Sequence, residues 1–489
     1  MVDFLKMPSL ILTPGVYIEQ DNSKLGAVAL VGRPRVLIMG QKLAAGNAVA
    51  GQAYRIDGGA AQAKALFGRG SQLADAVAGY RDNDETLELW ALGLADDAGG
   101  TAATYTITYT GPATAAGTVD LMVTHQRVTV PVTSGMTATQ VATAVAAAIN
   151  LYPDLVFTAA SAAGVVTLTA RHKGGEFNGL FIKANWKQGT TPAGLTVAIA
   201  AAVSGATNPD ASAAIAALGD TTWAHIVTPW NDGSDLVLAD LCEDRAGPSK
   251  MNYSEAYIAK IDSYSNFLTY SLSTRDSAYG LFLCIKLGCM PHSPWRVMAA
   301  YVAQIAVSAQ ADPALPFNGL VLKGILPPRE TDWFTRQERE FLLEGGGATL
   351  FVRNGAVCIE RAVTTSKTNA LGQEDYGQRD LNTVLTTNYL SASARTYLQG
   401  QFPRYKIADD ASIYPAEARV TDCRQIKAAL VTLAASDWVE KGLIENLEGF
   451  KTSLQVVRHA GDTSRADWQI RPDLVNGLHV LAGQVQPLL

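Results

Sequence analysis

The chain has 489 residues, more than one hydrophobic core usually serves, so we expect about two to four domains. Its 39 Lys and Arg residues nearly balance its 45 Asp and Glu residues, and a formal net charge of -6 argues against direct nucleic-acid binding, which relies on cationic side chains. The five cysteines are odd in number and scattered, which argues against a disulfide framework and favours free thiols in a reducing cytosol.

Residues 1–34 predict an extended arm. A short apolar run is interrupted at residues 14–15 by Pro and Gly, so no secretion signal is predicted. Alternating apolar and polar or amphipathic side chains then predict a strand: Val16, Tyr17, Ile18 and Glu19. Because an isolated strand is unstable in water, this one has to join a sheet, either in its own subunit or, by exchange, in a neighbour.

Residues 35–97 predict the first part of an α/β core domain. An apolar strand at residues 35–39 is followed by helical patterns at residues 60–67 and 72–80, and by a second strand at residues 86–91.

Residues 98–207 differ in composition and predict an inserted, β-rich outer domain. Only eight charged residues lie between Ala98 and Gly205. Period-two patterns predict strands at residues 104–109, 127–132, 155–158 and 165–169. A helix is predicted at residues 137–150, where Thr137 and Gln140 have capping-box spacing.

Residues 208–348 predict the second part of the core domain, with a strand at residues 224–228 and a buried helix at residues 296–309. Glu344 and the three glycines after it indicate a helix end rather than a hinge. Residues 349–472 predict a separate C-terminal α/β domain. Its expected strands are residues 350–352, 357–361 and 453–458, and its expected helices are residues 389–399 and 422–441.

Residues 473–489 predict a second arm. This segment has a strand-like pattern that includes Leu478, Val480 and Val485, and it also needs a sheet to join. Apolar stretches elsewhere are shorter than the roughly 20 residues that a membrane-spanning helix needs, so we expect a soluble protein without membrane insertion.

No pattern predicts catalysis, a cofactor or a metal. The six histidines lie far apart, and neither HExxH nor GxSxG occurs. Cys284, Cys289 and His292 have a metal-like spacing, but their apolar setting favours buried thiols. Glycine-rich pieces lack the GK[ST] ending of a phosphate-binding loop. We therefore expect a protein that is not an enzyme.

Several short segments, taken in order, resemble the Mu-like branch of contractile phage tail sheath proteins, and the resemblance extends over nearly the whole chain. The segments are TPGVYIE at residues 13–19, VLIMG at 36–40, DPA at 312–314, LKGI at 322–325, PP at 327–328, IERAVTT at 359–365, YKIADD at 405–410 and LVNGL at 474–478.

The resemblance implies an α/β (α+β) multidomain fold with a discontinuous core, an outward-facing inserted domain and extended strand arms at both termini. It implies copies that assemble as stacked hexameric rings around a tail tube and then contract, driving the tube through the host envelope. The arms would pair with neighbouring subunits through Val16, Tyr17, Ile18 and Glu19, and through Leu478, Val480 and Val485. An acceptor sheet would include Leu454, Val456 and Val457, and the tube would be contacted by Arg424, Lys427 and Lys441.

The implied partners are further copies of the chain, the tail tube protein, and baseplate and tail-terminator proteins, in a virion tail assembled in the host cytoplasm. A bacteriocin- or secretion-type contractile injection machine would use the same subunit design. A more remote alternative is an enzyme that uses the Cys and His residues, or a glycan-binding surface protein with a β-rich insert.

Overall fold

The computed structural model describes residues 34–187, 189–274, 276–369 and 371–486, which form two compact units. The central unit contains residues 34–386 and 476–486, and the C-terminal unit contains Thr387–Val475. The boundary between them lies within helix α9 (Leu381–Gln401). The mixed α/β fold class expected from the sequence is confirmed.

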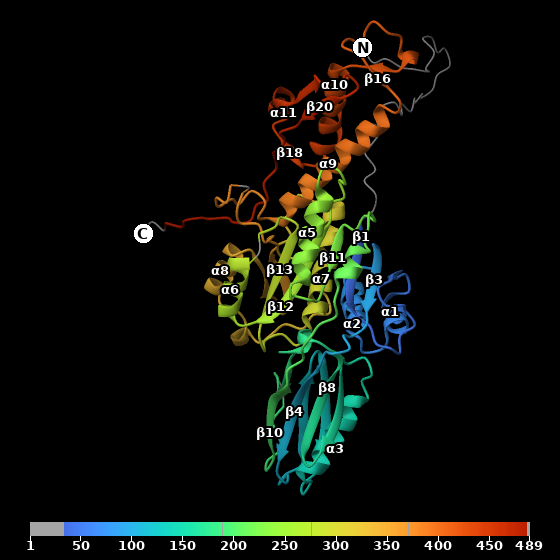
Figure 1. Cartoon of the computed structure of the whole chain (residues 1–489). Coiled ribbons are helices and arrows are strands. Elements are labelled where there is room, and N and C mark those ends of the chain that lie inside the picture. The colour runs from blue at the N-terminus through green and yellow to red at the C-terminus, as the bar shows by residue number, and fades with distance from the viewer. Residues whose placement is uncertain (1–33, 188, 275, 370, 487–489) are drawn as a thin grey trace, which may run out of the picture. The chain divides into compact units, whose positions relative to one another are not determined.

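The central unit is built on one eight-stranded sheet (Figure 1). Its six inner strands run parallel, and an antiparallel strand closes each edge. In spatial order the strands are β15 (Ala356–Arg361), β14 (Gly347–Arg353), β13 (Gly280–Lys286), β12 (Glu255–Asp262), β11 (His225–Val227), β1 (Arg35–Gln41), β3 (Glu88–Leu94) and β2 (Ala53–Arg55).

Helices cover both faces of this sheet, which explains why its inner strands are nearly continuous apolar runs. Val36 and Ile38 of β1 share a core with α2 and α7, whereas Leu37 and Met39 belong to a second core with α4 and α5. The helices are α1 (Gly59–Phe67), α2 (Gln72–Arg81), α4 (Ser212–Ala216), α5 (Ser234–Ala246), α6 (Tyr264–Thr274), α7 (Pro294–Ala311) and α8 (Arg336–Glu344).

Strands β14 and β15 correct the predicted start of the C-terminal domain at residue 349. Both belong to the central sheet, because β14 pairs in parallel with β13. The approach is close at Gly347, where a Cβ atom would lie 2.8 Å from the Cys284 sulfur. The predicted helix end is confirmed, since Gly345 caps α8 and Gly346 has a φ of 79°. The third glycine of this run, Gly347, instead begins the strand.

Residues 98–207, the predicted inserted domain, form two sheets, with helix α3 (Ala138–Asn150) packed on both (Figure 1). Most of their buried apolar side chains belong to the same hydrophobic cluster as those around the eight-stranded sheet. The capping box of Thr137 and Gln140 is confirmed. One sheet has the order β10 (Thr196–Val203), β4 (Ala102–Thr110), β8 (Val165–Lys173) and β7 (Phe157–Ala162). The other has the order β6 (Gln126–Val132), β5 (Gly117–Val123) and β9 (Ile182–Ala184).

The C-terminal unit contains the larger part of α9, two further helices and three two-stranded sheets. The predicted helix at residues 422–441 is shorter than expected: Asp422 caps α10 (Cys423–Leu433), which continues as one π-helical turn, Ala434–Trp438. The sheets pair β16 (Lys406–Ile407) with β17 (Val420–Thr421), β18 (Ile444–Glu445) with β21 (Asp473–Leu474), and β19 (Gln455–Arg458) with β20 (Ala466–Gln469). Helix α11 (Leu447–Ser453) precedes β19.

Candidate functional site

The residues with metal-like spacing do not form a metal site. Cys284 and Cys289 are buried, and burial raises the pKa of both thiols. Nε2 of His292 accepts a hydrogen bond from the Leu326 backbone N–H at 2.8 Å. Within the described residues, no group of three or more His, Cys, Asp or Glu side chains is arranged to hold a metal ion. None of the helices described is both long and apolar enough to cross a membrane.

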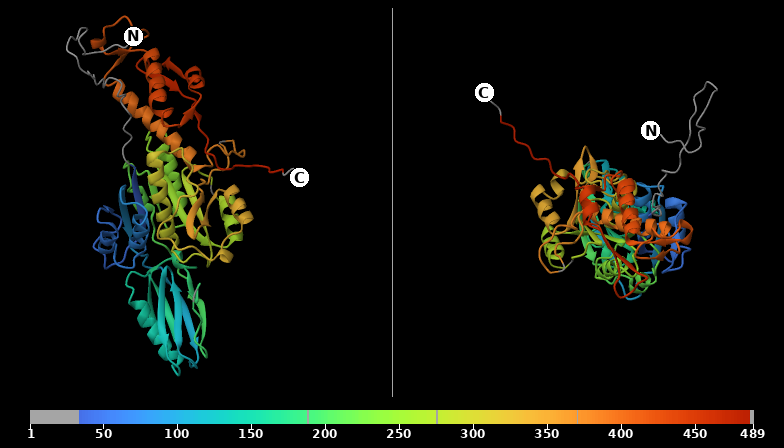
Figure 2. Two further views of the ribbon diagram at one scale, coloured as in Figure 1. Left: turned by 180° about the vertical axis from the view of Figure 1, so that it is seen from behind. Right: turned by 90° about the horizontal axis from the view of Figure 1, so that it is seen from above.

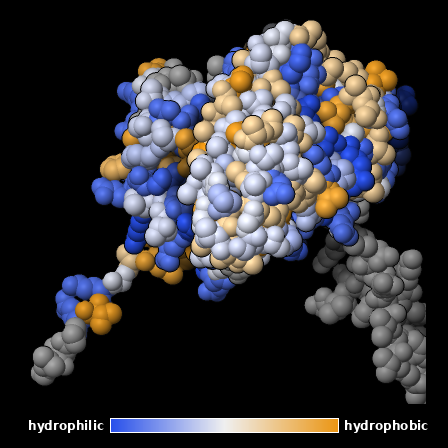
Figure 3. All heavy atoms as spheres, turned by 90° about the horizontal axis from the view of Figure 1, so that it is seen from below, coloured by the Kyte–Doolittle hydropathy of each residue, from blue (hydrophilic) through white to orange (hydrophobic). Residues whose placement is uncertain are grey.

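The C-terminal segment of the central unit extends away from the rest of that unit (Figures 1 and 2). Residues 476–486 contain no helix or strand. Near its base, Nε2 of His479 lies 3.8 Å from a carboxylate oxygen of Asp380. The large apolar side chains of this segment are exposed (Figure 3), with exposed fractions from 66% for Leu478 to 91% for Val485.

The predicted arm residues Leu478, Val480 and Val485 are thus exposed, and so is Leu481, which is 86% exposed. The sequence prediction did not single out Leu481, although it lies on the same face of an extended chain as Val485. Its neighbour Val480 points to the other face of an extended chain, so a strand formed here would present apolar side chains on both faces. The predicted N-terminal arm residues, Val16 to Glu19, lie outside the described residues.

The predicted acceptor strand is β19, which forms an antiparallel hairpin with β20. Val456 pairs with Trp468 and Val457 with Asp467. Leu454, just before the strand, is buried, whereas Val457 is exposed. Across the part of the chain that the structure describes, neither strand has a second strand partner, so each retains an open edge. A sheet of two short strands is marginally stable by itself, and further strands on these edges would stabilise it.

Helix α10 packs against this hairpin and carries two of the three predicted tube-facing residues. Lys427 donates a hydrogen bond to the Leu454 carbonyl at 2.8 Å, so its ammonium holds the chain before β19 in place. Arg424 is exposed and lies 2.6 Å from Asp410 and 3.1 Å from Asp422. The hydrogen bond that its guanidinium donates to Asp422, together with the charge of Asp410, raises the pKa of Arg424.

The third predicted tube-facing residue, Lys441, lies 2.7 Å from Asp437 and also contacts the Tyr389 hydroxyl. Its ammonium thus already has two partners within the C-terminal unit. The sequence prediction overlooked Ile413 and Tyr414, which are exposed in the loop between β16 and β17. This loop contains no periodic pattern that would have singled them out.

Comparison with known proteins identifies the family. The phage tail sheath protein central domain family matches residues 204–365. The chain is 35% identical, over 493 aligned positions covering 100% of both proteins, to the Mu-like prophage FluMu tail sheath protein of Haemophilus influenzae.

Two solved structures are similar at a lower level. A sheath tail protein from Desulfitobacterium hafniense has a TM-score of 0.47 and 11% identity, covering 94% of this chain and 100% of that one. A sheath tail protein from Listeria innocua has a TM-score of 0.47 and 13% identity, covering 90% and 95%. The full-length relative by itself establishes the family: the chain belongs to the Mu-like tail sheath proteins, which form the sheath of phage-like contractile tails.

Proposed function

We propose that copies of this chain polymerise as stacked hexameric rings around a tail tube, and that the resulting sheath shortens to drive the tube through the host envelope. One observation carries the proposal: an exposed apolar C-terminal segment and a two-stranded sheet with open edges occur in the same chain. Each is incomplete alone, and each supplies what the other needs.

The pairing chemistry is strand addition. An extended segment that joins an open edge satisfies the main-chain N–H and C=O groups of both, while its alternate side chains set the register. Leu478 and Val480 would lie on opposite faces from Leu481 and Val485, so both faces of the new strand would be covered by apolar contacts. The open edges of β19 and β20 provide two positions for the arms of neighbouring copies.

Polymer growth follows from the asymmetry of this contact. An arm and a hairpin are different surfaces, so each subunit makes a heterologous contact, which propagates as rings or helices. Several tethers per subunit raise the effective concentration of each remaining contact, so a subunit does not leave the lattice when one contact breaks. If the extended lattice is a kinetic trap, rigid domains can reorient into a lattice with larger interfaces while the arms remain paired.

On this view the stored interface energy does the work, so the chain acts as a structural subunit and not as an enzyme. Its further partners would be the tail tube, baseplate and tail-terminator proteins, in a virion tail assembled in the host cytoplasm. Among the predicted tube-facing residues, Arg424 is the most exposed. Lys427 and Lys441 also serve contacts inside their own unit, so we place Arg424 first for tube contact.

The decisive experiment deletes residues 477–489 and examines the purified chain for tubes by negative-stain electron microscopy. The apolar side chains of Leu478, Val480, Leu481 and Val485 are exposed, so circular dichroism should stay unchanged while tube formation is lost. Tubes formed as readily as by the full-length chain would contradict arm exchange. Deletion of residues 1–22 is the parallel test for the N-terminal arm.

A single substitution provides a matched test. Val480→Asp places a charge where the added strand should contact an apolar surface, and we expect it to suppress tubes as the deletion does. Gln484→Asp adds the same charge to the same exposed segment at a position that is already polar, and it should assemble normally. Loss of tubes in both variants would mean that net charge, and not strand contact, controls assembly.

The energy source is tested on assembled extended particles. Heating without nucleotide should shorten the sheath to its contracted length, measured on individual particles by electron microscopy. A requirement for added ATP would contradict stored interface energy as the source of work.

A further inference from the structure

The inserted domain meets the rest of the central unit along a seam that is rich in ionisable side chains. Apolar contacts cross it, among them that between the Phe177 and Trp295 rings, whose centroids lie 5.1 Å apart. Polar contacts cross it as well: Asp154 pairs with Lys64 at 3.1 Å, and Lys187 donates to the Pro327 carbonyl at 2.8 Å. A cavity of about 540 Å³ opens along the seam beside His125 and Arg296.

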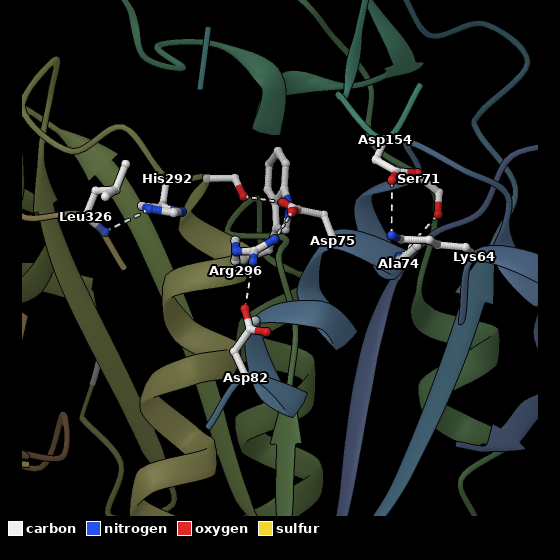
Figure 4. A network of polar contacts seen from close by, with 12 residues as sticks. Lys64, Ser71, Ala74, Asp75, Asp82, Asp154, His292, Arg296 and Leu326 are labelled. Atoms are coloured by element: carbon white, nitrogen blue, oxygen red, sulfur yellow. Dashed lines mark hydrogen bonds and ion pairs between the residues drawn. The ribbon is translucent and has the colours of Figure 1, made fainter. Parts of the chain in front are cut away.

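Two histidines face each other across this seam. His125 lies in the two-residue turn between β5 and β6 of the inserted domain, and His292 precedes α7 of the core. Their rings are stacked, with centroids 5.2 Å apart and planes inclined by 5°. Because Nε2 of His292 accepts the Leu326 N–H (Figure 4), the proton of that neutral ring is on Nδ1. Within the described residues, Nδ1 of neither ring has a hydrogen-bond partner.

The charges around the pair leave it without a counter-ion of its own. From α2, Asp75 accepts hydrogen bonds from Ser293, Trp295 and Arg296, and Asp82 accepts one from Arg296 (Figure 4). From α7, the Arg296 guanidinium adds a positive charge beside both rings. Lys64 of α1 and Asp154 of the inserted domain, which line the same cavity, are already paired with each other.

Burial accordingly disfavours a proton on either ring. It lowers the pKa of His125, and the charge of Asp75 partly offsets this shift. It also lowers the pKa of His292, and the charges of His125 and Arg296 lower that pKa further. Above the ordinary histidine pKa of about 6.5, both rings are neutral whether the seam is closed or open. Below that pH the two histidines take up protons freely only when the seam is open, so their titration favours opening in acid. Glu176 acts in the opposite sense, because its buried carboxyl keeps a proton in the closed seam. His172 lies 2.7 Å from Asp96 at the same seam.

We propose that the inserted domain docks on the core through an acid-labile joint, in which the stacked His125–His292 pair closes the seam at neutral pH. Protonation of both rings places two positive charges face to face beside Arg296. It also removes the acceptor of the Leu326 N–H, since a protonated imidazole has no free lone pair.

Hydrogen exchange tests the joint directly in the full-length chain carrying Glu176→Gln, in which the opposing titration of Glu176 is absent. After correction for intrinsic rates, protection of the Leu326 amide should fall about tenfold between pH 7.5 and pH 6.0, because two histidines with an open-state pKa near 6.5 take up protons in this range. Amides of β12 and β13, in the centre of the sheet, should keep their protection. Equal Leu326 protection at the two pH values would overturn the proposal.

Substitution in the same Glu176→Gln chain separates the titration from packing. In the double variant His125→Phe and His292→Gln, a ring still fills the seam and the Gln oxygen can accept the Leu326 N–H, but neither group takes a proton. We expect its Leu326 protection to change less than about twofold over the same pH range. His459→Gln, which removes a histidine of the C-terminal unit, should leave the response of the Glu176→Gln chain unchanged. A tenfold loss in the double variant would assign the pH effect to other groups and refute the joint.

Discussion

The central sheet and the seam below it are held together by different forces. Along the sheet, neighbouring strands are joined by main-chain hydrogen bonds and covered on both faces by apolar side chains. Across the seam, ion pairs and hydrogen bonds to side chains lie beside the ring contacts of Phe177 with Trp295 and of His125 with His292.

The difference determines which part responds to conditions. Apolar burial does not titrate, so the sheet should keep one geometry over the whole pH range in which the chain folds. Buried ionisable groups gain or lose protons with the solvent, so the strength of the seam can change while both flanking cores stay intact. A subunit that must move as rigid bodies gains from having its adjustable contacts between domains and its fixed contacts inside them.

The largest effect is expected inside the sheet. Phe282 of β13 is buried against Phe267 and Tyr270, with ring centroids 6.1 and 5.0 Å away. Phe282→Ala should lower the free energy of unfolding of the central unit by about 3–5 kcal/mol, because it leaves a cavity. Urea unfolding should give the same loss at pH 6.5 and pH 8. Leu287→Ala, at an exposed position just after the same strand, should cost much less. A pH-dependent loss for Phe282→Ala would contradict the expectation that the sheet, unlike the seam, does not respond to pH.

The next largest effect on the free energy of unfolding is expected at Asp75. Burial opposes its ionisation, but Arg296, with Ser293, holds its pKa at about 2. Asp75→Asn removes the charge and leaves Arg296 partly unpaired in a buried site, which should cost about 3 kcal/mol at neutral pH.

The sign of its pH dependence follows from the depressed pKa. The stabilisation is fully present above the unfolded-state value of 3.8 and is lost as pH falls towards 2. The difference in unfolding free energy between the unmodified chain and Asp75→Asn should therefore shrink on acidification below pH 4, as measured by urea titration. A constant difference down to pH 2 would show that Asp75 contributes through shape alone.

Sequence reasoning succeeded where the determinants are local. The period-two pattern of β4 and the capping box of α3 depend on residues within a few positions of each other, and both were predicted. The pairing of β14 with β13 was not, because it joins residues more than 60 positions apart, and Gly347 resembles part of a helix stop. Helix α9 begins at Leu381, earlier than predicted, since its first turns contain β-branched residues whose weak helix propensity is overridden by packing.

Local patterns also predicted some residues of the candidate surfaces, whereas others depend on residues far apart in the sequence. The sequence predicted Leu478, Val480 and Val485 as arm residues, but it did not single out Leu481, which shares a face with Val485. The His125–His292 stack had no sequence signal, because the two residues come from different domains and share no motif spacing. Only the fold brings them together.

The buried carboxyl of Glu176 allows the seam to be tested at higher pH. It is buried at the base of the inserted domain and accepts hydrogen bonds from Asn208 and from the backbone and side chain of Asn231. Burial, opposed by the Asn231 bond, raises its pKa to about 8. The folded chain therefore retains a proton that the unfolded chain releases above about pH 4.5, and stability falls as pH rises between these values.

Glu176→Gln should remove this slope. Between pH 5.5 and 7.5 the variant should gain on the unmodified chain by up to about 1.4 kcal/mol per pH unit in chemical denaturation. Glu448→Gln, at an exposed carboxylate of the C-terminal unit, should leave the slope unchanged. If the unfolding free energy of Glu176→Gln had the same pH dependence as that of the unmodified chain, the Glu176 carboxyl would have to be ionised in the folded state. The seam around it would then not be buried.

The smallest effect should be confined to the inserted domain and should not reach the seam. Thr137→Ala removes the hydroxyl that accepts the Gln140 N–H and should destabilise α3 by about 1 kcal/mol. Hydrogen exchange would show faster opening of α3 amides, with the Leu326 amide unaffected at neutral pH. Thr139→Ala, at an exposed position of the first turn, provides the matched control, since it caps nothing and alanine favours the helix. If Thr137→Ala also weakened Leu326 protection, the inserted domain and the core would open as one cooperative unit, and the seam would not be the separable joint that its polar contacts predict.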